Sequence, residues 1–201
     1  MTRPFILGLT GSIGMGKSTT ASLFARRGIP IHDADAAVRR LYATGGAGAR
    51  LIADLFPDAI AQDDSVDRAR LRDHVLGQPE SLARLEAAIH PLVRAEEQSF
   101  LDEHADASLV ILDIPLLFET GGEARCDAVL VVTADPEVQR QRVLARPGMS
   151  EATLAAILAK QMPDAEKRAR ADVLIDTGLG LADAENQVDA LIERLAGLGP
   201  V

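Results

Sequence analysis

Near its N-terminus the chain reads Gly11-Ser12-Ile13-Gly14-Met15-Gly16-Lys17-Ser18. This stretch matches the pattern G-x-x-x-x-G-K-[ST] at every fixed position. Small residues let the backbone curl so that several N–H groups point at a phosphate, and a following helix adds the positive end of its dipole. We expect Lys17 to reach the β- and γ-phosphates and the Ser18 hydroxyl to bind Mg²⁺. The stretch therefore predicts a protein that binds ATP or GTP together with Mg²⁺.

The residues on either side of this loop fit a strand before it and a helix after it. Phe5–Leu9 is a short apolar run, and 17–27 favours a helix that Gly28 ends. Asp135 and Pro136 have the residue types of a helix start. Further apolar runs, each expected to form a strand between helices, lie at 29–31, 109–113, 127–133 and 173–175. This alternation predicts an α/β, P-loop NTPase fold with about five parallel strands and helices on both faces.

The middle of the chain looks different from this pattern. Residues 46–105 read as nearly all helix, and Pro91 should kink or restart one of these helices at His90. We therefore expect one kinase domain over 1–201 with a helical insertion at about 46–105. The remaining parts would be a short lid at about 146–170 and a core built from about 1–45, 106–145 and 171–201.

Composition narrows the class of protein. The 201 residues are 47% apolar, enough for one compact domain, and carry a formal charge of −9, which disfavours binding to nucleic acid or a membrane surface. The single cysteine, Cys126, cannot form an internal disulfide, and no His/Cys cluster suggests a metal site. With no expected signal peptide and no apolar run of about 20 residues, we expect a cytoplasmic protein.

Two absences and one pair of carboxylates favour a small-molecule kinase over other P-loop proteins. The chain lacks the Asn-Lys-x-Asp stretch by which many P-loop proteins recognise guanine. It also lacks a strand that ends in adjacent Asp-Glu, a feature of many motor ATPases. Asp33 and Asp35 follow the second expected strand, where ligands bind in parallel α/β sheets. At least one of them is expected to act as the base for an attacking hydroxyl. Alternatively, Asp33 caps a helix and Asp35 is a first-turn acid.

A basic region stands out in this acidic chain. Residues 140–170 contain seven Lys and Arg against three Asp and Glu. Arg142 and Arg146 are four residues apart and therefore share one face of a helix. Such a pair at the edge of a lid can hold phosphoryl oxygens and screen developing charge. The alternative is an ordinary solvated helix face.

Taken together, these motifs resemble the dephospho-CoA kinase family over nearly the whole chain. The resemblance rests on motifs that occur in the family's order: 8–19, Asp33-Ala34-Asp35 with Arg39, Leu85-Glu86 with His90-Pro91, 114–119, Gln161-Met162-Pro163 with Lys167, and 171–176. It implies a nucleotide-kinase-like fold with a five-stranded parallel core. It also implies transfer of the ATP γ-phosphate to the ribose 3′-hydroxyl of dephospho-CoA, the last step of coenzyme A biosynthesis.

The resemblance also assigns roles to individual residues. Asp35 matches the aspartate proposed as base, Arg142 matches a lid-side arginine near the phosphates, and Lys17 completes the catalytic set. Residues implied in ATP binding are Gly11, Ser12, Ile13, Gly14, Met15, Gly16, Lys17, Ser18, Thr19 and Arg146. Residues implied in acceptor binding are Thr10, Asp33, Arg39, His90, Pro115, Leu116, Leu117, Phe118 and Glu119.

Parts of this pattern have other interpretations. Leu116, Leu117 and Phe118 could be core residues, and His90 an ordinary helix residue. The chain also departs from the family where Thr177 replaces a common Asn, and in the lid sequence 146–149, where an acidic residue commonly follows the arginine.

Two other functions remain open at this stage. One is a P-loop kinase for a nucleoside, nucleotide or sugar acid, and the other is a nucleotide-dependent switch that binds a protein partner. As partners we expect ATP and dephospho-CoA, no nucleic acid and no membrane, with the chain a monomer or small homo-oligomer.

Overall fold

The computed structural model describes residues 3–196. The chain divides into two compact units, which are described separately below. The first comprises residues 1–32 with 104–201, and the second is Asp33–Glu103. The second unit begins earlier in the chain than the insertion expected at about 46–105, so it also takes in the helix that follows Asp33.

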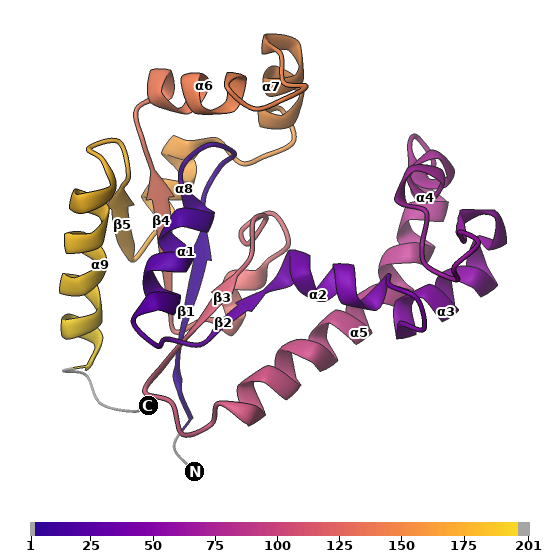
Figure 1. Ribbon diagram of the computed structural model, residues 1–201, viewed down its shortest axis with the longest axis horizontal. Helices are drawn as coiled ribbons and strands as arrows, with labels where there is room; N and C mark the ends of the chain where they lie inside the picture. Colours follow the sequence, from indigo (N-terminus) through magenta and orange to yellow (C-terminus); the bar gives the residue numbers. More distant parts are fainter. Residues whose placement is uncertain (1–2, 197–201) are drawn as a thin grey trace. The chain divides into compact units, whose positions relative to one another are not determined.

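The first unit is built on a five-stranded sheet (Figure 1). Its strands are β1 (Phe5–Thr10), β2 (Ile31–Asp33), β3 (Leu109–Asp113), β4 (Ala128–Thr133) and β5 (Val173–Asp176), in the order β2-β3-β1-β4-β5. Leu7 on the central strand pairs in parallel with Ile111 on one side and with Ala128 on the other. Every residue of β3 is buried, as expected for a parallel strand covered on both faces. The predicted fold class is confirmed.

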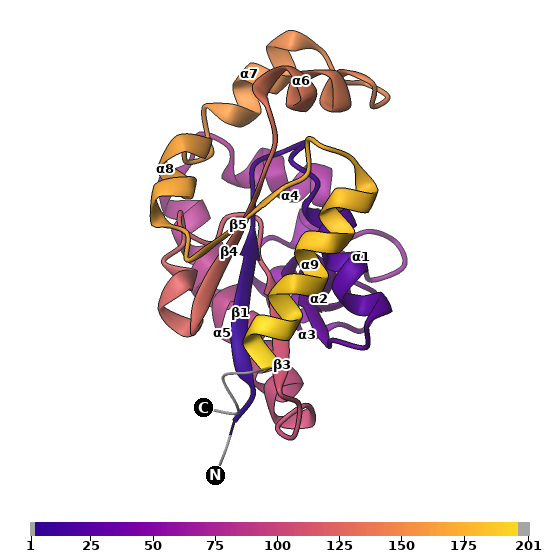
Figure 2. The same ribbon diagram turned by 90° about the vertical axis from the view of Figure 1, so that its left-hand side faces the viewer.

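Helices lie on both faces of this sheet. The helices of this unit are α1 (Lys17–Arg26), α6 (Pro136–Leu144), α7 (Glu151–Leu158), α8 (Asp164–Arg170) and α9 (Leu181–Ala196), with a short 3-10 helix, η2, at Gly122–Arg125. Figure 2 shows α1 and α9 on one side of the sheet and α8 on the other. The core between the sheet and α1 and α9 includes Leu9, Phe24, Leu130, Ile175 and Val188. Both views show α6 and α7 beyond the end of the sheet where β1 turns into α1.

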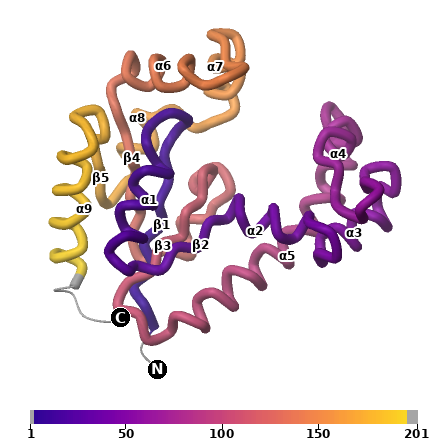
Figure 3. Tube along the Cα trace, viewed as in Figure 1, coloured from indigo at the N-terminus to yellow at the C-terminus, as the bar shows by residue number. Residues whose placement is uncertain are grey.

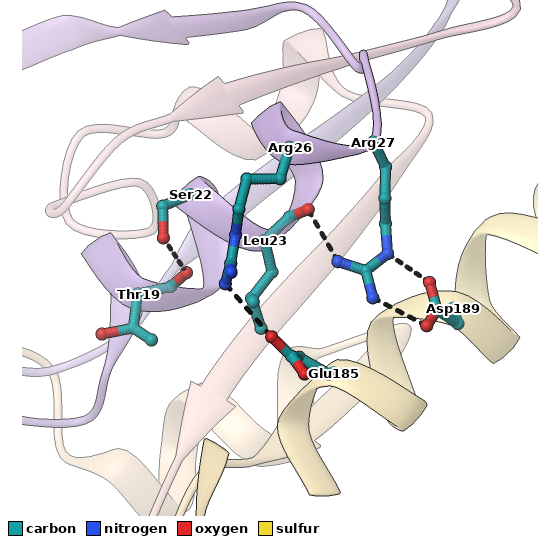
Figure 4. Close-up of polar contacts among 7 residues, drawn as sticks. All are labelled: Thr19, Ser22, Leu23, Arg26, Arg27, Glu185 and Asp189. Carbon is teal, nitrogen blue, oxygen red and sulfur yellow. Dashed lines mark hydrogen bonds and ion pairs between the residues drawn. The ribbon is translucent and has the colours of Figure 1, made fainter. Parts of the chain in front are cut away.

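Surface ion pairs join α1 to α9 (Figure 4). The guanidinium of Arg27 contacts both carboxylate oxygens of Asp189, one of them at 2.7 Å, and also donates to the carbonyl of Leu23. Arg26 donates to Glu185 at 3.2 Å. Exposed pairs of this kind add little to stability, so the buried apolar residues between the helices matter more.

Most helix boundaries follow from local chemistry. Asp135 caps α6 by accepting from the N–H of Glu137, with Pro136 at the first helical position, as predicted. The second strand, however, lies at Ile31–Asp33 rather than 29–31. The N–H of Ile29 still bonds the carbonyl of Phe24 at the end of α1, so the strand cannot start until after Pro30.

The second unit, Asp33–Glu103, is helical (Figure 3, indigo-violet to magenta). It contains α2 (Ala34–Leu41), α3 (Ala47–Leu55), the 3-10 helix η1 (Pro57–Ala59), α4 (Arg68–Val75) and α5 (Pro79–Glu103). The long helix α5 packs against α2, α3 and α4 around a core that includes Ile52, Phe56, Leu71, Leu85 and Ile89.

Of the two outcomes expected at Pro91, a kink or a restart of the helix at His90, the restart does not occur. Helix α5 runs without interruption from Pro79 to Glu103 with Pro91 inside it. A proline in this position removes one backbone hydrogen bond. Leu85 and Ile89, six and two residues before the proline, are buried in the helical core and hold the helix in place. Among residues 3–196, no helix is long and apolar enough to cross a membrane.

Candidate active site

The glycine-rich loop lies between β1 and α1, at the carboxyl end of the central strand. Gly14 and Gly16 have φ angles of 79° and 90°, a region that residues with a Cβ rarely adopt. The N–H of Met15 bonds the carbonyl of Ser12 at 3.1 Å, which closes the turn. Gly16, the residue before α1, provides no side-chain cap. The backbone N–H groups of the first turn are therefore able to donate hydrogen bonds to an anion.

The predicted phosphate-binding lysine contacts a carboxylate that sequence reasoning did not place in the site. The ammonium group of Lys17 donates to Asp113, the last residue of β3, which is the strand beside β1. The side chains are 17% and 7% exposed, so the pair is largely shielded from water. The one sequence signal for Asp113 was a carboxylate at the end of a buried strand, which in a parallel sheet meets the loop after the neighbouring strand.

Two glutamines hold the tip of the loop from the other side. Gln139 on α6 donates its amide N–H to the carbonyl of Ile13 at 2.7 Å. Gln161, which follows α7, accepts from the N–H of Ile13 at 3.1 Å. Side chains from α6 and from the segment after α7 thus bind both backbone groups of one loop residue.

A cavity of about 290 Å³ lies beside the loop. Its walls include Gly14, Gly16 and Thr19 from the loop and α1, and Arg142, Arg146 and Thr177 from the α6 and β5 side. Two arginines thus face the same cavity as the phosphate-binding backbone, which suits an anionic ligand. Arg142 donates to the hydroxyl of Thr177 at 2.8 Å and to its carbonyl at 2.7 Å, whereas Arg146 is exposed.

The residues after β3, expected to bind the acceptor, divide into two kinds. The hydroxyl of Thr10 donates to the carbonyl of Pro115 at 3.0 Å, which joins the end of β1 to this segment. Leu117 and Phe118 are 0% and 6% exposed, so their side chains belong to the core. Leu116 is 40% exposed and is therefore the apolar side chain of the three most able to contact a ligand.

Glu119 is engaged by two groups from the segment after α7. Its Oε1 lies 2.8 Å from the ammonium of Lys167 and accepts from the N–H of Met162, also at 2.8 Å. Burial alone would raise the pKa of Glu119, but these two donors hold that pKa below its ordinary value. Lys167 is fully buried, and Glu119 supplies the opposite charge that offsets the cost of burying it.

The remaining predicted residues, Asp33, Asp35, Arg39 and His90, belong to the second unit. Asp33 caps α2 by accepting from the N–H of Ala36 at 2.9 Å and lies 3.3 Å from Arg39. The interpretation of Asp33 as a helix cap is therefore confirmed. Asp35 lies in the first turn of α2 and is exposed, and His90 is exposed on α5.

In the part of the chain that the structure describes, no three His, Cys, Asp or Glu side chains gather as a metal site. The donors beside the loop suit a Mg²⁺ ion that also binds phosphate oxygens. Ser18 is exposed in the first turn of α1, and its neighbour Lys17 contacts Asp113. A hydroxyl such as that of Ser18 and a carboxylate such as that of Asp113 are the kinds of oxygen ligand that Mg²⁺ takes in P-loop proteins.

Comparison with known proteins identifies the family. The dephospho-CoA kinase family pattern matches residues 5–183. A dephospho-CoA kinase of Mesorhizobium japonicum is 60% identical over 194 residues, covering 96% of this chain and 97% of the relative. A Thermus thermophilus protein of known structure is 39% identical, with a TM-score of 0.84 and coverage of 96% of this chain and 98% of that chain.

A dephospho-CoA kinase from Campylobacter jejuni shares the fold, with a TM-score of 0.66, 22% identity and coverage of 94% and 96% of the two chains. The family match spans the phosphate loop, Arg142, Arg146 and the segment after β3. The predicted family is confirmed: this chain belongs to the dephospho-CoA kinase family.

Proposed function

We propose that this chain transfers the γ-phosphate of ATP to the ribose 3′-hydroxyl of dephospho-CoA, giving coenzyme A and ADP. The observation that carries the proposal is the cavity walled by both the phosphate-binding loop and Arg142, in a chain of this family. Backbone N–H groups and a guanidinium that line the same cavity can bind a polyphosphate and stabilise the charge that develops on it during transfer.

On the donor side, the loop residues 11–19 would bind the β- and γ-phosphates through backbone N–H groups, Ser18 and Lys17. Lys17 would exchange its contact with Asp113 for phosphate oxygens or share it with them. Arg142 and Arg146 would contact oxygens of the γ-phosphate, where negative charge shifts during transfer.

Mg²⁺ would be held by the Ser18 hydroxyl, with Asp113 as its carboxylate neighbour, and would neutralise charge on the phosphates. The residues of the chain supply the remaining chemistry. They orient the donor, exclude water and accept the proton of the attacking hydroxyl.

On the acceptor side, Asp35 would take the proton as the 3′-oxygen attacks the γ-phosphorus and the bond to the β–γ bridging oxygen breaks. The carboxylate of Asp35 is exposed, whereas that of Asp33 is occupied in capping α2, so Asp35 fits the role of base better than Asp33. The insertion at about 46–105 and the segment 114–119 would bind dephospho-CoA, with Arg39, His90 and Leu116 as contacts. Residues 146–170 would close over the donor as a lid.

The net charge of −9 disfavours binding to nucleic acid. We also expect a cytoplasmic enzyme that is a monomer or small homo-oligomer. These expectations about location and partners stay predictions.

A coupled assay of ADP release tests the proposed reaction. The purified chain is supplied with ATP and Mg²⁺ and either dephospho-CoA or a panel of nucleosides, nucleotides and sugar acids. We expect dephospho-CoA to give a kcat/KM at least about a hundredfold above any other acceptor, as binding sites with buried polar groups discriminate strongly. Equal or faster turnover of a panel member would assign the chain to a different acceptor.

A further inference from the structure

Thr177 occupies an unusual place beside the cavity. It follows β5 directly, its backbone N–H bonds the carbonyl of Thr133 at 2.9 Å, and the residue is only 6% exposed. The same residue contacts Arg142 on α6 and Met15 in the phosphate loop. It therefore joins the sheet, the lid-side helix and the loop at one point.

The Thr177 hydroxyl donates one hydrogen bond toward the phosphate loop and accepts another from Arg142. A hydroxyl has one proton to donate, and the carbonyl of Met15 at 2.8 Å is nearer than that of Thr133 at 3.3 Å. Its oxygen accepts from Nη1 of Arg142 at 2.8 Å. Nη2 of Arg142 donates to the backbone carbonyl of the same threonine at 2.7 Å. The guanidinium is thus fixed at two points to a residue that is itself bonded to the loop.

Packing leaves this contact little freedom. Gly16 has a φ of 90°, and a Cβ built on it would lie 2.9–3.1 Å from three side-chain atoms of Thr177. The threonine side chain therefore fills the space that the glycine leaves open. Movement of Thr177 away from the loop would break its contacts with both Gly16 and Met15.

We propose that Thr177 is a positioning residue that sets the guanidinium of Arg142 against the phosphate-binding loop. The inference rests on the role given above to Arg142 and adds the group that orients it. A free arginine side chain loses substantial rotamer entropy when it is fixed on a phosphate. Thr177 fixes it in advance, so the charge is in place when the γ-phosphate is transferred.

Isosteric substitution separates this role from simple packing. Thr177→Val keeps the side-chain shape and removes both hydroxyl hydrogen bonds, whereas Thr177→Ser keeps the hydroxyl and removes only the methyl group. Since hydrogen bonds to charged groups are the stronger ones, we expect Thr177→Val to lower kcat about tenfold. Thr177→Ser should stay within about threefold of the wild type, and the KM for dephospho-CoA should change little in either variant.

A double-mutant cycle with Arg142→Ala tests whether Thr177 acts through the arginine. Arg142→Ala alone should lower kcat by about 10² or more. Adding Thr177→Val to Arg142→Ala should then change kcat by less than about twofold. Melting curves and the Kd for ATP are measured for all four proteins. Thr177→Ala gives the same comparison if Thr177→Val does not fold.

Two results would overturn the inference. One is a normal kcat in Thr177→Val beside a strongly reduced one in Arg142→Ala. The other is an equal loss from Thr177→Val with and without Arg142, which would mean that the threonine acts on the loop alone. Neither result bears on the proposed reaction, which is judged by wild-type turnover of dephospho-CoA.

Discussion

The ammonium group of Lys17 lies against the carboxylate of Asp113, and the two residues end up together although they are 96 positions apart in the chain. Lys17 opens α1, directly after the glycine-rich loop, and Asp113 ends the neighbouring strand β3. The pair puts one positive and one negative side chain at the site where phosphates and Mg²⁺ are proposed to bind. A phosphate there would compete with Asp113 for the lysine, and Mg²⁺ would compete with the lysine for Asp113.

Replacing Lys17 with alanine should remove a charge that serves the transferred phosphate. We expect Lys17→Ala to lower kcat on the order of 10²–10³, the usual effect of losing a preorganised charged contact. The protein should remain folded, because the lysine lies outside the apolar core. The control is Arg26→Ala at the far end of the same helix, where a 58% exposed side chain pairs with Glu185. Turnover of Lys17→Ala above about a third of the control would contradict the assignment.

The two aspartates of the Asp33-Ala34-Asp35 stretch should respond differently to substitution. Asp35→Asn should lower kcat roughly 10²–10⁴-fold with little change in the Kd for ATP, because a base contacts the acceptor hydroxyl and not the nucleotide. Asp33→Asn should be milder, since an amide oxygen still accepts from the N–H of Ala36. Steady-state kinetics and ATP titrations check both. If Asp33→Asn abolishes turnover while Asp35→Asn is silent, the two roles are reversed.

The contact between Gln139 and Ile13 should matter for ATP binding. Gln139→Ala removes the donor to the Ile13 carbonyl, and a lost hydrogen bond of about 1 kcal/mol should raise the KM for ATP about fivefold. Gln141→Ala is the matched control, because Gln141 lies on the same helix but is exposed and bonds only Glu137 at 3.2 Å among the contacts described. Equal KM values for the two variants would show that Gln139 does not hold the loop.

The pair between buried Lys167 and Glu119 should add to the stability of the segment after α7. Lys167→Met leaves the Glu119 carboxylate, which is 18% exposed, without its cation and should lower the free energy of unfolding by about 2 kcal/mol, the order of a lost hydrogen bond to a charged group. Adding Glu119→Gln should recover part of that loss, because a neutral side chain no longer needs a cation and still accepts from Met162. Arg168→Met, at an exposed position of the same helix, should cost under about 1 kcal/mol. Urea denaturation that finds the double variant less stable than Lys167→Met would refute this account.

Local chemistry explains which parts of the fold could be predicted from sequence. The loop was predictable because Gly14 and Gly16 adopt positive φ angles, which glycine takes without steric cost. Continuous apolar runs identified the strands. The start of β2 was misplaced because the N–H of Ile29 still bonds the carbonyl of Phe24 in the last turn of α1. The restart expected at His90 as the alternative to a kink does not occur, because buried residues of α5 hold that helix in the core of the second unit.

Contacts between distant segments account for what the sequence could not reveal. In the basic region 140–170 the sequence set apart Arg142 and Arg146 by their spacing, but it did not show that the basic side chains have three different environments. Arg142 is bound to Thr177 beside the cavity, Arg140 forms exposed pairs with Glu137 and Glu151, and Lys167 is fully buried. Only the fold separates them, because each environment is set by a partner from another element or turn. The hydrogen bond from Gln139 to Ile13 spans 126 residues and was missed for the same reason.

The most direct test of the central claim follows the phosphate itself. The chain is incubated with Mg²⁺, dephospho-CoA and ATP carrying a radioactive γ-phosphate, and the products are separated and examined by phosphorus NMR. The account predicts that the label appears in coenzyme A as a phosphate monoester on the ribose 3′-oxygen, with one ADP formed for each molecule of product. Label released only as inorganic phosphate, or attached at any other position of the acceptor, would contradict it.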